Sequence, residues 1–165
     1  MDCDIAVFME EGGNTIMNKD EKEQKKQESW QLLEYGYIKQ IESLQIRLKC
    51  AQEWIRVYCC GQSMRDKCKQ KKIENIVIYG VSNFALLLIE ACFKEDIHIV
   101  GISDSKITTG GMDYLGIPFI SPQMINNLGN NVTIVITAMG FVEEIKHELI
   151  GRGINNIISL LELIE

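Results

Sequence analysis

The hydrophobic positions between residues 30 and 58 recur at steps of three and four, the spacing of one face of an α-helix. They are Trp30, Leu33, Tyr37, Ile41, Leu44, Leu48, Ala51, Ile55 and Tyr58. Two successive steps of four around Tyr37 form a stutter in this heptad-like pattern, and Gly36 lies beside the stutter. The pattern predicts an amphipathic helix with a bend or break near Gly36.

An apolar stripe of this length needs a surface to cover it, and the sequence leaves two sources open. The helix packs on its own domain, pairs with a second copy of the chain, or does both. Because the stripe is longer than one small domain is expected to cover, we predict self-association, as a homodimer, through residues 30–58.

A glycine and a capping residue mark the end of this helix and the start of a shorter one. Gly61 is a helix-terminating residue, and Ser63 followed by Asp66 resembles a capping box. A second helix is expected to run to about Lys72. Residues 30–71 are therefore predicted to form a helical arm.

Beyond the arm the pattern changes to apolar strands that alternate with helical segments. The expected strands are 76–79, 97–102, 132–137 and 156–160, and the expected helices are 84–92, a segment that begins at Ser121-Pro122, and 142–149. This order predicts an α/β domain over residues 72–165 with a doubly wound parallel sheet of about four to five strands. The second strand is expected beside the first, and the third on the first strand's other side.

Composition and charge narrow the functions that this domain can have. Hydrophobic residues make up 46% of the chain and the net charge is −6, so we predict no binding to nucleic acid. Residues 1–29 are polar and charged, and we expect their start to be disordered. The chain shows no apolar run that would span a membrane and no secretion signal in its first twenty residues. A cytoplasmic location is therefore expected.

The residues that catalysis or metal binding would need do not form a recognisable set. The six cysteines contain no C-x-x-C pair, and His98 and His147 are the only imidazoles. Tyr35 and Lys39 match the Tyr-x-x-x-Lys pair of short-chain dehydrogenases and sugar epimerases. In those enzymes the pair lies after the glycine-rich turn, whereas here it lies before the only candidate turn, at Gly80, so we take the match as chance. We predict neither a catalytic residue nor a metal ligand.

The turn after the first expected strand carries a partial dinucleotide-binding fingerprint. Gly80, Ser82 and Ala85 occupy its three glycine positions, and Asp104 ends the next strand 24 residues after Gly80. Such an aspartate accepts hydrogen bonds from a ribose. The alternative is structural: Gly80 only permits a turn and Asp104 only caps a loop. About 93 residues follow Lys72, and a domain of this length is too short for the two halves of a dinucleotide fold. Binding of NAD is therefore disfavoured.

Several segments of this domain resemble the small Rossmann-like domains of bacterial surface-polysaccharide gene clusters. The segments are 72–80, 99–104, 116–122 and 135–138. They are similar to the N-terminal nucleotide-sugar-binding domain of sialic-acid-type sugar O-acyltransferases and to the front half of nucleoside-diphosphate-sugar epimerase-like proteins. The resemblance implies a half-Rossmann fold that binds a nucleotide or nucleotide sugar, with a UDP-sugar favoured over NAD.

The resemblance also assigns residues to the ligand. Gly80, Ser82 and Asn83 would meet phosphate, Asp104 would meet the nucleoside, and Thr137 with Ala138 would line the cleft; Phe84, Ala85 and Ser103 belong to the same turns. The leading hypothesis is a non-catalytic binding module of envelope or capsule polysaccharide synthesis. One alternative is a small NAD-dependent or nucleotide-sugar-modifying enzyme completed by a partner subunit. The other is a structural assembly module with a vestigial cleft.

Overall fold

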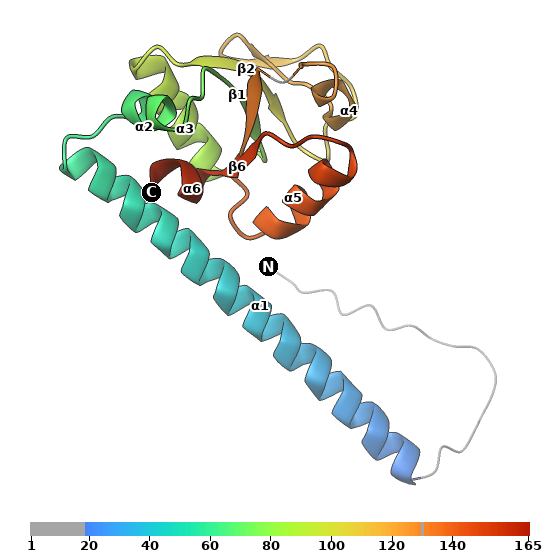
Figure 1. The fold of residues 1–165 in the computed structure, drawn as a ribbon. Helices are drawn as coiled ribbons and strands as arrows, with labels where there is room; N and C mark the ends of the chain where they lie inside the picture. Colours follow the sequence, from blue (N-terminus) through green and yellow to red (C-terminus); the bar gives the residue numbers. More distant parts are fainter. Residues whose placement is uncertain (1–18, 130) are drawn as a thin grey trace. The chain divides into compact units, whose positions relative to one another are not determined.

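The computed structural model describes residues 19–129 and 131–165 and divides the chain into two units, residues 1–39 and residues 40–165. The elements, labelled in Figure 1, are α1 (Lys19–Cys59), α2 (Met64–Gln70), β1 (Asn75–Tyr79), α3 (Asn83–Lys94), β2 (His98–Ser103), β3 (Asp113–Tyr114), β4 (Ile117–Pro118), α4 (Pro122–Ile125), β5 (Val132–Ile136), α5 (Val142–Gly151), β6 (Ile157–Ser159) and α6 (Leu160–Ile164). None of the described helices is both long and apolar enough to cross a lipid bilayer.

Helix α1 begins earlier than expected and is continuous through Gly36. Residues 19–29, which were assigned to a charged, disordered segment, are helical, and the rest of that segment, residues 1–18, lies outside the described residues. The expected break near Gly36 is wrong, because α1 is one uninterrupted helix from Lys19 to Cys59. A stutter lengthens the local hydrophobic repeat to eleven residues, or about 3.67 residues per turn. This value is close to the value of about 3.6 residues per turn in an ordinary α-helix, so a stutter does not require a break.

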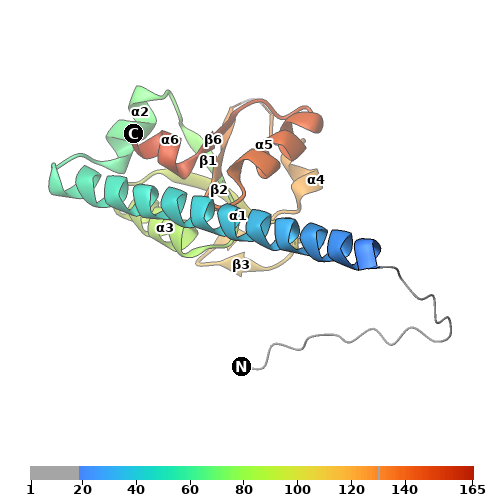
Figure 2. The same ribbon diagram turned by 90° about the horizontal axis from the view of Figure 1, so that it is seen from below.

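The second unit is built on a four-stranded parallel sheet of order β2-β1-β5-β6, which confirms the predicted α/β fold class and strand order. Side chains of β1 alternate between its two faces. Ile76 and Ile78 pack in one core cluster with α2, α3, α6 and the end of α1, whereas Val77 and Tyr79 pack in the other with α4 and α5 (Figures 1 and 2). The sheet therefore carries helices on both faces.

Two small elements were not predicted from the sequence. The first is the hairpin β3–β4, whose turn residues Leu115 and Gly116 have φ values of 55° and 81°. Two positive φ values are typical of a type I′ turn. The two strands of the hairpin are too short to give an alternating apolar pattern, so the sequence did not reveal them. The second is α6, which begins at Leu160, where the fourth strand was expected to continue. The expected cap of α2 is confirmed, since the Ser63 side chain accepts a hydrogen bond from Asp66 N.

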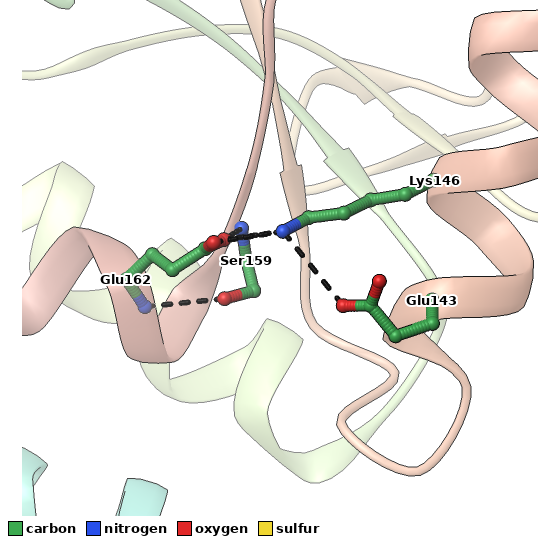
Figure 3. A network of polar contacts seen from close by, with 4 residues as sticks. All are labelled: Glu143, Lys146, Ser159 and Glu162. Carbon is green, nitrogen blue, oxygen red and sulfur yellow. Dashed lines mark hydrogen bonds and ion pairs between the residues drawn. The ribbon is translucent and has the colours of Figure 1, made fainter.

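An ion pair joins α5 to α6 (Figure 3). Lys146 Nζ lies 2.8 and 2.9 Å from the two carboxylate oxygens of Glu162, and Ser159 N donates to Glu162 Oε2 at 2.6 Å. Partial burial raises the pKa of Glu162, but hydrogen bonds from Lys146 and Ser159 outweigh this effect and hold the pKa below its ordinary value of 4.5. The carboxylate is thus stabilised in its charged form.

We predict that Glu162→Gln lowers the free energy of unfolding by about 0.5–1 kcal/mol at pH 7, as expected for a partly exposed pair. A lowered folded-state pKa gives stability that is present above the unfolded-state pKa and lost as the pH falls through the folded-state pKa. Urea denaturation of both proteins should therefore give curves that converge below pH 4.5. Glu143→Gln is the matched control, because Glu143 lies 4.0 Å from Lys146 and is 87% exposed. An equal loss in the control would contradict the prediction.

Candidate functional site

A pocket of about 910 Å³ lies where the carboxyl ends of β1, β2 and β5 meet. The chain leaves β1 towards β2 on one side and later returns to β5 on the other, so the pocket lies at the topological switch point of the sheet. In open parallel sheets this is the usual place for a ligand. Its lining includes Tyr79–Phe84, Asp104–Ile107, Thr137–Met139, part of α5 and Arg47 of α1.

Gly80 is needed by the fold itself at the turn after β1. Its φ is +100°, and a Cβ added there would lie 2.8 Å from the Cβ of Ala138. Thr137, which is fully buried, donates from Oγ1 to the Gly80 carbonyl at 2.6 Å. The ends of β1 and β5 are therefore fastened together at this point, and a glycine is required there whether or not a phosphate approaches.

Ser82 caps helix α3. Its hydroxyl accepts from Ala85 N at 3.3 Å and donates to the Thr137 carbonyl at 3.0 Å, so its one proton is already used within the protein. Asn83 and Phe84 form the first turn of α3 and line the pocket. Their N–H groups have no acceptor within the helix, because the first turn precedes every carbonyl that would serve. Donors for an anion therefore come from this backbone and not from the Ser82 side chain.

Asp104 supports the same turn. Its Oδ2 accepts from Val81 N at 3.0 Å and its Oδ1 accepts from Lys106 N at 3.1 Å. From the predicted strand order, Gly80 and Asp104 are expected on opposite walls of the cleft. This prediction is wrong, because the contact holds the Asp104 carboxylate against the residue that follows Gly80. A carboxylate has about four acceptor positions, so Asp104 keeps capacity for a ligand hydroxyl.

The structure brings most of the predicted site residues together. Seven of them line the pocket: Gly80, Ser82, Asn83, Phe84, Asp104, Thr137 and Ala138. Ala85 and Ser103 are not among the lining residues; Ala85 packs in the core, and Ser103 is fully buried with its carbonyl bonded to Gly80 N. Their part in the site is limited to positioning the turn.

Sequence reasoning missed the charged groups that complete the pocket. Arg47 and Lys106 are its cations, and Glu144 and Glu148 of α5 add carboxylates to Asp104. Arg47 belongs to α1, and its guanidinium lies close to the loop after β5. A Cβ added at Gly140 in that loop would lie 3.4 Å from Arg47 Nη2. Glu148 is paired with Arg152 at 2.6 Å. No local pattern links Arg47 to this pocket, so only the tertiary structure reveals it.

Two hydroxyl groups lie buried without a hydrogen-bond partner among the described residues, those of Tyr79 and Ser103. These residues are paired across β1 and β2, and Tyr79 lines the pocket. Burial raises the pKa of Tyr79, the carboxylates of Glu148 and Asp104 raise it further, and Arg152 lowers it. The phenol is therefore a protonated donor at neutral pH.

Three thiols of the described chain, those of Cys50, Cys68 and Cys92, are buried. Burial raises the pKa of Cys50 and Cys68 to about 11 and that of Cys92 to about 12, so these thiols stay protonated at neutral pH. Within residues 19–129 and 131–165, no three His, Cys, Asp or Glu residues are grouped as metal ligands.

We predict that Gly80→Ala lowers the free energy of unfolding by about 2–4 kcal/mol, since the new Cβ meets Ala138 in a strained backbone conformation. Gly151→Ala is the control, because a Cβ at Gly151 in α5 has no neighbour within 4 Å. It should leave the stability unchanged or raise it by up to about 1 kcal/mol. Chemical denaturation measures both variants, and equal effects would refute the role given to Gly80.

We predict that Tyr79→Phe leaves the stability unchanged or raises it by about 1 kcal/mol, because it removes a buried hydroxyl that has no partner. Thermal and chemical denaturation without ligand provide the measurement. A loss of more than about 1 kcal/mol would mean that the hydroxyl makes a stabilising hydrogen bond in the folded protein.

Comparisons with known proteins give no relative from which a function can be transferred. The chain was compared with protein-family models, with curated proteins and with solved structures, and none of the three comparisons found a match. The function is therefore inferred from the pocket and the residues that line it.

Proposed function

We propose that residues 72–165 bind a nucleotide or nucleotide sugar in the pocket at the carboxyl end of the sheet. The observation that carries the proposal is the position of the pocket at the switch point between β1 and β5. Its volume of about 910 Å³ lies within the range of small-molecule and cofactor sites. A UDP-sugar is favoured over NAD because the domain forms only one half of a dinucleotide fold.

The lining residues supply groups that suit the parts of such a ligand. The first-turn N–H groups of α3, together with the Arg47 guanidinium, suit a diphosphate. Asp104 accepts from Val81 N, Lys106 N and Ser105 Oγ, and its remaining acceptor capacity suits a ribose hydroxyl. Phe141 and Ile145 add apolar surface for a base. In this proposal the module binds its ligand without reacting with it.

Two further functions stay open beside this one. A structural assembly module with a vestigial cleft is favoured by the internal use of Gly80, Ser82 and Asp104, whose contacts stabilise the turn. A small NAD-dependent or nucleotide-sugar-modifying enzyme would need groups from a partner subunit. From the resemblance we also propose a cytoplasmic, homo-oligomeric protein that acts in envelope or capsule polysaccharide synthesis.

We predict that calorimetry with UDP, UDP-sugars, NAD and CoA gives the highest affinity for the UDP ligands. Arg47→Gln should weaken that binding about ten- to a hundred-fold, because it removes a charged donor to phosphate. Arg56→Gln is the matched control on the same helix, since Arg56 pairs with Glu53 and does not line the pocket.

Each outcome separates the hypotheses. Weaker binding in the Arg47 variant with normal binding in the Arg56 variant supports the nucleotide site. A preference for NAD favours the enzyme. No binding of any of the four ligands at millimolar concentration favours the structural module and overturns the proposal.

A further inference from the structure

Helix α1 leaves the stripe predicted from the sequence largely uncovered. Its large side chains are exposed as follows: Trp30 64%, Leu33 53%, Tyr37 65%, Ile41 54%, Leu44 61%, Leu48 61%, Ile55 61% and Tyr58 43%. Isolated exposed apolar residues are ordinary, but a continuous row along one helix is typical of an interaction surface.

The domain of residues 40–165 does not use this face of the helix. The side chains of α1 that pack in its core are Cys50, Trp54 and Val57. At about 100° per residue, Cys50 and Val57 lie on the side of the helix opposite Leu48 and Ile55. Residues 40–59 therefore have one face for their own domain and another for a second surface.

The size and spacing of the stripe suit another helix. The eight side chains leave on the order of 100 Å² each, or about 800 Å² per chain, which matches one side of a standard protein–protein interface. From Ile41 to Tyr58 the steps alternate between three and four, the spacing of the a and d positions of a coiled coil. A second copy presents the same row and so offers a matching partner.

We infer that a second copy of this chain docks on the α1 stripe, helix against helix, with Leu33, Tyr37, Ile41, Leu44 and Leu48 in the contact. This inference names the surface and the occupant of the proposed homo-oligomer, on which it rests. It does not require the pocket to bind a nucleotide, so ligand-free protein tests it.

The test compares two variants of the full chain by analytical ultracentrifugation. Leu33→Glu with Tyr37→Glu places two charges on the stripe. Leu32→Glu with Tyr35→Glu makes the same chemical change on the opposite side of α1, where these side chains are 73% and 61% exposed. Circular dichroism checks that both variants keep the helix.

We expect a dimer for the natural chain and for the Leu32/Tyr35 variant, with at least ten-fold weaker association for the Leu33/Tyr37 variant. A monomeric natural chain overturns the inference, and if removal of residues 1–18 then produces a dimer, those residues cover the stripe instead. Equal association of both variants also overturns it, because assembly then uses a different surface. Binding to lipid vesicles by a monomeric chain would assign the stripe to a membrane surface and would likewise refute the inference.

Discussion

The close approach of two strand ends, those of β1 and β5, is the contact on which the rest of the domain depends. Gly80 lies against Ala138, and Thr137 Oγ1 bonds to the Gly80 carbonyl at 2.6 Å. These strands are neighbours in the sheet but distant in the chain, and they lead into helices on opposite faces. The ladder between β1 and β5 ends at Tyr79 and Ile136, and this junction extends the contact between the strands to the point where the pocket opens.

Hydrogen bonds within the protein already use several polar groups near the junction, which leaves fewer of these groups for a ligand. The Ser82 hydroxyl donates a hydrogen bond to the Thr137 carbonyl, and the Asp104 carboxylate accepts hydrogen bonds from two backbone N–H groups. The remaining donors of the lining include the first-turn N–H groups of α3, the Tyr79 hydroxyl and two cations, Arg47 and Lys106. A nucleotide proposal therefore rests more on backbone and on Arg47 than on the side chains that a glycine fingerprint emphasises.

Helix α1 carries both a residue of the pocket and the exposed apolar stripe. Arg47 lines the pocket, while Leu44 and Leu48, which flank it in sequence, are each 61% exposed on the stripe. A partner helix on Leu44 and Leu48 would lie beside the segment that carries Arg47.

Local periodicity by itself determined the main helices and the four buried strands, because burial on both sheet faces requires continuous apolar runs such as Ile76–Tyr79. It did not determine α6 or the hairpin β3–β4, whose segments are too short to give a pattern. It also placed Gly80, Asp104 and Thr137 at strand ends that a parallel sheet must bring to one edge. Tertiary structure alone decided that Gly80 faces Ala138, that Asp104 binds the turn and that Arg47 enters the pocket. The physical reason is that these contacts join residues far apart in the chain, whose distances no local spacing encodes.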